Sequence, residues 1–260
     1  MKIIGIIQAR MSSTRLPGKV LLEAAGKPLI LHMLERMSRC NSLDSLWLAT
    51  SEERDDDLLA ETVEAAGYQV FRGSLENVLS RFWRICKKEK ADIVVRLTGD
   101  CPLHDPEVVD SVVDFFLKGG GAYDYASNVL PPTYPDGLDT EVFSAQALQE
   151  AYQEASLDFD LEHVSPYIRR TTKERGRMGN FYGPADFSHL RWTLDEPEDY
   201  VFIRSVYEDL YLAKKTFGWL DVIAWQTKES ERLQINAMHK RKAYRVGARI
   251  PCSRSQGMNP

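Results

Sequence analysis

The loop that follows the first apolar segment of the chain has the composition of a phosphate-binding site. Residues 8–19, with the sequence QARMSSTRLPGK, place Arg10, Arg15 and Lys19 among hydroxyl side chains and one glycine. Bound phosphates need charge neutralisation, hydroxyl donors and uncovered backbone amides, and this segment supplies all three. It matches neither G-x-x-x-x-G-K-[ST] nor G-x-G-x-x-G, so both of those phosphate motifs are excluded. A merely solvated loop is the alternative, but the first 22 residues contain no acid to balance the cations.

Two carboxylates that follow predicted strands have the chemistry to hold a divalent cation. Asp100 lies in the segment TGDCP, residues 98–102, where a glycine frees the turn and a proline stiffens it. Magnesium is commonly held by one or two carboxylates together with substrate phosphates. Asp195 follows another predicted strand, and Pro197 beside it suits the first turn of a helix. A Gly-Asp turn is common by itself, so Asp100 could be an ordinary turn residue. For Asp195 a metal role is expected only together with Asp100. The acids just after Pro197 are interpreted as residues favoured near a helix start.

Alternating apolar patterns over the first half of the chain predict a parallel α/β sheet that positions these residues. Strands are expected at 2–8, 46–50, 68–71 and 92–98, and helices at 28–39, 55–66 and 75–90. Such alternation requires crossover connections, and ligands then bind beyond the carboxyl ends of the strands. The cationic loop and Asp100 are both placed there. After residue 120 the alternation ends, and we expect the second half to complete and cover the sheet, with helices near 144–156, 162–173 and 197–215 and a strand at 187–194.

The composition excludes several classes of partner. The 260 residues include 33 Lys and Arg against 38 Asp and Glu, a formal net charge of −5. A mildly acidic chain has no global field that would attract nucleic acid or an anionic membrane. No apolar run approaches the roughly 20 residues of a membrane span. The four cysteines form no C-x-x-C pair, which favours neither a zinc site nor a disulfide framework. A cytoplasmic protein is therefore expected.

The charge is unevenly distributed along the chain. Residues 228–260 carry eight basic and two acidic side chains, whereas residues 1–227 are strongly acidic. We therefore predict a main α/β domain at 1–227 and a basic C-terminal extension at 228–260.

These motifs together resemble those of the cytidylyltransferases that activate acidic sugars. That family includes the CMP-octulosonate and CMP-sialic acid synthetases and a branch named for spore-coat polysaccharide biosynthesis. The likeness spans residues 1 to about 215, and it rests on ARMSSTRLPGK at 9–19, GKPLI at 26–30, GDCP at 99–102 and DEPED at 195–199. It implies a three-layer α/β/α domain of the nucleotide-diphospho-sugar transferase type with a mostly parallel sheet.

The resemblance also implies an activity and a set of site residues. The enzyme would be a Mg²⁺-dependent nucleotidyltransferase that moves CMP from CTP onto a sugar, expected to be acidic, and releases pyrophosphate in surface or cell-envelope polysaccharide biosynthesis. Asp100 and Asp195 would hold Mg²⁺, and Arg10, Lys19 and Asp100 would be catalytic. The predicted nucleotide contacts are Ala9, Arg10, Ser12, Arg15, Lys19, Gly73, Ser74 and Asn77. The last three are nearly as well explained as turn and helix-cap residues.

The likeness is strongest with the spore-coat branch, which leaves the acceptor open. The segment DGLDTEVF at 136–143 looks like that branch and unlike the octulosonate enzymes, and it falls in the half where the sugar should lie. Candidate contacts to an acidic acceptor are Asn128, Glu141 and Arg191, although each could instead be a surface, capping or ion-pair residue. The resemblance also raises the expectation of a homodimer.

Two other functions remain open. A glycosyltransferase of the same fold would use a nucleotide-sugar donor, but such enzymes usually carry D-x-D where this chain has GDC at 99–101. A non-catalytic nucleotide-binding scaffold in polysaccharide assembly is the other, and the presence of Lys19, Asp100 and Asp195 together argues against it.

Overall fold

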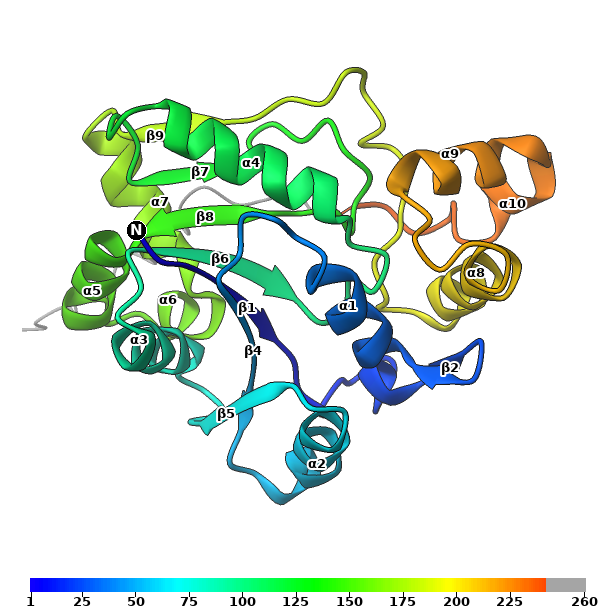
Figure 1. Cartoon of the computed structure of the whole chain (residues 1–260), viewed down its shortest axis with the longest axis horizontal. Helices are drawn as coiled ribbons and strands as arrows, with labels where there is room; N and C mark the ends of the chain where they lie inside the picture. Colours follow the sequence, from blue (N-terminus) through cyan, green and yellow to red (C-terminus); the bar gives the residue numbers. More distant parts are fainter. Residues whose placement is uncertain (242–260) are drawn as a thin grey trace, which may run out of the picture.

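Within residues 1–241, which a computed structural model describes, seven strands form one sheet in the order β5-β4-β1-β6-β8-β7-β9 (Figure 1). Neighbours from β5 to β6 pair in parallel, β8 pairs antiparallel with β6 and β7, and β7 pairs in parallel with β9. The predicted mostly parallel sheet is confirmed. The strands are β1 (Ile3–Gln8), β4 (Ser45–Ser51), β5 (Gln69–Gly73), β6 (Ile93–Thr98), β7 (Tyr125–Ser127), β8 (Glu141–Ser144) and β9 (Met178–Asn180).

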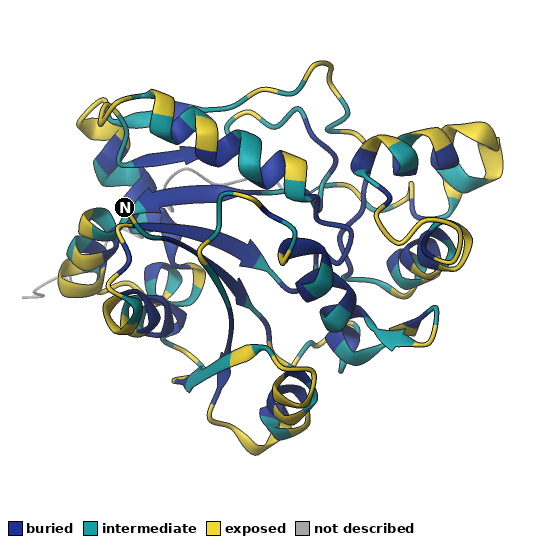
Figure 2. Ribbon diagram, in the orientation of Figure 1, coloured by how far each residue is buried: buried dark blue, intermediate teal, exposed yellow. Residues whose placement is uncertain are grey.

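Helices cover both faces of the sheet, and the alternation of side chains along β1 explains how. Ile3 and Ile7 point to a core shared with α1, α2 and α4, whereas Ile4 and Ile6 point to a core shared with α3, α5 and α7. Figure 2 shows the central strands as the most continuously buried part of the molecule. These helices are α1 (Leu29–Met37), α2 (Asp57–Ala65), α3 (Val78–Glu89), α4 (Pro106–Lys118), α5 (Ala145–Glu154), α6 (Asp158–His163) and α7 (Ser165–Glu174).

A third apolar cluster lies beyond the end of the sheet, on the right in Figure 1. It is formed mainly by α8 (Pro197–Val206), a π-helical turn (Tyr207–Tyr211) and α9 (Trp219–Lys228), with α10 (Ser230–Gln234) beside α9. Shorter elements are a hairpin of β2 (Glu23–Ala24) and β3 (Lys27–Pro28) and 3₁₀ turns at Lys19–Leu21 and Arg54–Asp56. No helix within residues 1–241 is long and apolar enough to cross a bilayer.

Several sequence-based predictions of the second half are corrected. The segment 187–194 is not a strand, because its only ladder contact is an isolated bridge between Arg191 and Asp136. The helix predicted at 162–173 is divided into α6 and α7 at Val164, whose φ of 67° interrupts the helical backbone. Helix α4 and strand β8 were not predicted.

The predicted C-terminal extension begins inside packed structure. Its described part, residues 228–241, continues from α9 through α10, and Asn236 is buried against the main body, donating to the Arg191 carbonyl at 2.9 Å. Residues 242–260 lie outside the described residues, so the division at 227 stays a prediction.

Candidate active site

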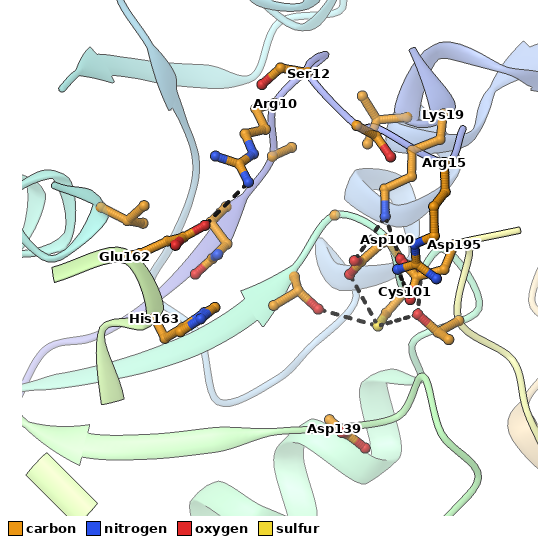
Figure 3. A pocket seen from close by; sticks show the side chains of 18 of the residues that line it. Arg10, Ser12, Arg15, Lys19, Asp100, Cys101, Asp139, Glu162, His163 and Asp195 are labelled. Carbon is orange, nitrogen blue, oxygen red and sulfur yellow. Dashed lines mark hydrogen bonds and ion pairs between the residues drawn. The ribbon is translucent and has the colours of Figure 1, made fainter. Parts of the chain in front are cut away.

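A pocket of about 480 Å³ opens at the carboxyl ends of β1 and β6 (Figure 3). Gln8 and Thr98, the last residues of these strands, are paired in register, so the loops that follow them necessarily lie side by side. The charged side chains and the histidine that line the pocket are Arg10, Arg15, Lys19, Arg81, Arg96, Asp100, Asp136, Asp139, Glu162, His163, Arg191 and Asp195.

The cationic loop after β1 has a fixed backbone. The Gly18 amide donates to the Met11 carbonyl at 3.0 Å, and the Met11 amide donates to Asp56 Oδ1 at 2.7 Å. Gly18 has a φ of 68°, a left-handed conformation that glycine adopts without cost. This turn leads into the 3₁₀ turn that carries Lys19, whose side chain is only 11% exposed where it enters the pocket.

Lys19 joins the two predicted metal ligands. Its Nζ lies 3.0 Å from Asp100 Oδ2 and 2.9 Å from Asp195 Oδ1, and Arg15 lies 3.1 Å from the other oxygen of Asp195 (Figure 3). Burial opposes the charged form of Lys19, yet the two carboxylates raise its pKa overall. Burial likewise works against ionised Asp195, but Lys19 and Arg15 lower its pKa to about 2. Lys19 and Asp195 are therefore both charged at neutral pH.

Two backbone features bring Asp100 and Asp195 together. A Cβ on Gly99 would lie 2.7 Å from the Ala9 side chain and 3.1 Å from the Gln8 carbonyl, so only glycine allows this approach. The Leu194 amide donates to the Asp100 carbonyl at 2.7 Å, which places the next residue beside Asp100. Segments almost a hundred residues apart in sequence are thus joined at one point of the pocket.

The start of α8 fixes Asp195 from its other side. Asp199 accepts hydrogen bonds from the amides of Asp195 and Glu196 at 3.0 and 2.9 Å, and it binds Arg191 through two contacts of 2.8 and 2.7 Å. The interpretation of Asp199 as an acid favoured at a helix start is confirmed. Arg191 does line the pocket, but its guanidinium is already engaged by a fully buried carboxylate.

Five of the predicted contact residues do not line the pocket. Asn77 caps α3 by accepting from the Ser80 amide at 2.8 Å, and Ser74 Oγ accepts from the Asn77 amide at 3.0 Å. Gly73 packs under Arg81, where a Cβ would lie 2.9 Å from Arg81 Cγ. These positions have the turn and cap roles that were the alternative interpretation.

The other two, Asn128 and Glu141, lie behind the pocket wall. The Asn128 amide group binds the backbone of Leu138 and Thr140 at 2.8 and 2.9 Å, so it shapes the chain around Asp139. Glu141 forms an ion pair with Arg96 and accepts from the Tyr125 hydroxyl at 2.6 Å. Although burial opposes ionisation of Glu141, Arg96 and Arg169 lower its pKa.

Several residues that the fold brings to the pocket are not among the predicted contacts. His163, at the end of α6, has its pKa lowered by burial, with Arg96 and Arg169 adding to the effect. Asp136 and Asp139 come from the DGLD segment, which had been noted only as a branch marker. Cys101 is buried and its thiol pKa is raised well above the usual range, first by burial and then by Asp100, so it is not a thiolate nucleophile.

Comparisons with known proteins agree with this geometry. The profile of a family described as Cytidylyltransferase matches residues 4–236. The chain is 36% identical to spore coat polysaccharide biosynthesis protein SpsF of Bacillus subtilis, over 79% of this chain and 86% of that protein. It is 30% identical to 8-amino-3,8-dideoxy-manno-octulosonate cytidylyltransferase of Shewanella frigidimarina, over 70% of each. The solved structure of a cytidylyltransferase from Leptospira borgpetersenii superposes with a TM-score of 0.84 and 35% identity, covering 90% of this chain and 97% of that one.

Proposed function

The chain belongs to the cytidylyltransferase family, and from that premise we propose that it transfers CMP from CTP to a sugar acceptor with release of pyrophosphate. The observation that carries the proposal is the convergence of Lys19, Asp100 and Asp195 beside a cationic loop at the ends of parallel strands. The names of the two relatives support a polysaccharide pathway and an acidic sugar as acceptor. A cytoplasmic location and a homodimer belong to the same proposal.

The paired carboxylates fit Mg²⁺ as the cofactor. Asp100 and Asp195 each place an oxygen within 3.0 Å of the Lys19 ammonium, so a cation already lies between them. No group of three or more His, Cys, Asp or Glu side chains with metal-binding geometry occurs in residues 1–241. Two carboxylates with phosphate and water oxygens are a usual Mg²⁺ environment. Bound there, Mg²⁺ would supply charge neutralisation to the phosphates of CTP.

The side chains of the pocket then have distinct tasks in the transfer. The acceptor hydroxyl attacks the α-phosphorus of CTP, the bond from that phosphorus to the bridging oxygen breaks, pyrophosphate leaves with the electron pair, and the hydroxyl proton passes to water. Arg10, Arg15 and Lys19 stabilise the charge on the β- and γ-phosphates, and Lys19 reaches them by leaving its carboxylate partners. Phosphoryl transfers of this kind depend mostly on positioning and charge stabilisation.

A pyrophosphate-release screen tests the proposal. The four nucleoside triphosphates are crossed with 3-deoxy-manno-octulosonate, its 8-amino analogue and N-acetylneuraminate in the presence of Mg²⁺, and we expect turnover with CTP. Asp100→Asn should lower kcat by about 10²–10³-fold without unfolding the protein, whereas the exposed Asp55→Asn control should not change it. Near-normal turnover by Asp100→Asn would contradict the metal assignment. Release of a nucleoside diphosphate from a nucleotide sugar would indicate glycosyl transfer, and CTP binding without turnover would indicate a scaffold.

A further inference from the structure

The DGLD segment, residues 136–139, forms part of the pocket wall that the mechanism above leaves unused. Both of its aspartates line the pocket, and Figure 3 shows Asp139 away from the cluster of Lys19, Asp100 and Asp195. The phosphate loop therefore faces one part of the cavity and Asp139 another.

The backbone around Asp139 is held from three directions. Asn128 binds the carbonyl before Asp139 and the amide after it, and His104 Nε2 lies 3.1 Å from the Asp139 carbonyl. Gly137 has a φ of 118°, and a Cβ there would lie 2.7 Å from the Trp192 carbonyl. The segment thus needs glycine at 137 and leaves Asp139 little freedom to move.

The C-terminal segment supplies a cation to this carboxylate. Arg241 Nη2 donates to Asp139 Oδ1 at 2.5 Å, and its Nη1 donates to the Tyr134 carbonyl at 3.1 Å. The same segment is anchored upstream, where Asn236 binds Asp199 at 3.0 Å and His239 lies 3.1 Å from Glu198. The side chains of Arg241 and Asp139 are 14% and 15% exposed, so the pair is largely removed from water.

The place of Asp139 on the pocket wall is the feature that points to a ligand. Arg241 donates to Asp139 Oδ1, and the side chain of Asp139, which is 15% exposed, borders the pocket. Burial raises the pKa of Asp139 to about 7 even though Arg241 opposes the shift. A carboxylate on the wall of a pocket is a strong hydrogen-bond acceptor, and a hydroxyl of a sugar in the pocket is a suitable donor to it.

We propose that Asp139, held in place by Arg241, accepts a hydrogen bond from a hydroxyl of the acceptor sugar and so determines which acceptor is used. Arg241 is a positioning residue, because it acts on the acceptor through Asp139. The inference rests on the proposed function, but it concerns the acceptor alone and predicts no contact with CTP.

Asp139→Asn tests the inference, because it keeps the size of the side chain and removes the charge. Using the panel sugar with the highest turnover, we expect the acceptor KM to rise about 10- to 100-fold, the range for a lost hydrogen bond to a charged group. The KM for CTP should stay within about twofold of the wild-type value. Lys240→Ala removes a neighbouring exposed cation of the same segment and is the matched control.

Arg241 variants separate positioning from a general effect on folding. Arg241→Ala should also raise the acceptor KM, and Arg241→Lys should raise it less. In the double variant of Asp139→Asn with Arg241→Ala, the acceptor KM should be no higher than in Asp139→Asn alone. An unchanged acceptor KM, or an equal rise in the KM for CTP, would overturn the inference. Absence of turnover by the wild type with every panel sugar would instead defeat the proposed function, and this is seen before any variant is measured.

Discussion

The phosphate side and the acceptor side of the pocket contain the same kinds of charged side chain but hold them differently. On the phosphate side, defined as residues 8–19 with Asp100 and Asp195, the two arginines meet acids in contacts open to water. Arg10 is 42% exposed beside Glu162 and Arg15 is 38% exposed beside Asp195, whereas Lys19 is only 11% exposed. On the acceptor side, defined as Arg96, residues 136–141 and Arg191, the ion pairs are largely buried from water.

Burial gives this difference an energetic meaning. The Arg191–Asp199 pair is 6% and 0% exposed, and the Arg96–Glu141 pair is 10% and 1% exposed. A solvent-exposed ion pair contributes little stability, whereas breaking a buried pair leaves a charge without compensation. Arg10 and Arg15 can therefore exchange their partners for a ligand, while the cations on the acceptor side fix the shape of the cavity.

The largest expected effect is on stability, from a change on the acceptor side. Glu141→Ala removes the carboxylate that faces Arg96 and the acceptor of the Tyr125 hydroxyl. We expect the free energy of unfolding to fall by about 3–5 kcal/mol, the range for breaking a buried pair from one side. Urea denaturation measures this change. The control is Glu150→Ala, which removes an ion pair with Arg175, whose side chain is 50% exposed. If Glu141→Ala lowered the free energy of unfolding as little as the control does, the ion pairs of the acceptor side would contribute no more to stability than exposed ones.

The next effect is on activity, from a change on the phosphate side. Lys19→Ala removes the cation that joins Asp100 and Asp195 and that we expect to bind phosphate. We expect kcat to fall about 10²–10³-fold, as for loss of one group that stabilises developing charge. Pyrophosphate release measures it, and Lys118→Ala, whose side chain is 80% exposed, is the control. If Lys19→Ala lost stability but kept its kcat, the contacts of Lys19 with Asp100 and Asp195 would be structural, and the two sides of the pocket would not differ in role.

The phosphate side was predictable from sequence because its signals are local. Three cations with no acid nearby, a Gly-Asp turn and an acid before a helix start are each contained in a short segment. The strands that carry the first two are long apolar runs, and parallel pairing then brings their ends together. The four strands predicted in the first half were found with boundaries only slightly displaced.

The acceptor side was not predictable because its contacts join distant segments. Arg241 and Asp139 are 102 positions apart, and Arg96 and Glu141 are 45 apart, so no spacing rule relates them. Strand β8 has four residues, one of them charged, and its place in the sheet is set by antiparallel pairing with β6. Sequence reasoning chose polar residues of the right type there, but it did not show that Asn128 and Glu141 bind the protein itself.

A smaller effect concerns acid stability and tests whether the phosphate side is held by charge. The folded-state pKa of Asp195 is about 2, below the unfolded value of about 3.9. The resulting stability is present above the unfolded pKa and is lost as pH falls through about 2, and the shift corresponds to about 2–3 kcal/mol. We expect wild type to lose more stability than Asp195→Asn between about pH 5 and pH 2. Equal losses in urea denaturation would show that Asp195 gains nothing from Lys19 and Arg15.

The smallest effect should come from the exposed pair between Arg10, on the phosphate side, and Glu162 of α6. Glu162→Gln removes the carboxylate 3.3 Å from Arg10, and because both side chains are exposed we expect the free energy of unfolding to change by less than about 0.5 kcal/mol. Releasing Arg10 from its acid leaves it available to phosphate, so CTP should bind about two- to threefold more tightly. Calorimetric titration with CTP measures this, and Glu64→Gln on the exposed face of α2 is the matched control. Weaker CTP binding by Glu162→Gln would mean that this acid orients Arg10 toward the nucleotide, and the phosphate side would then depend on fixed ion pairs just as the acceptor side does.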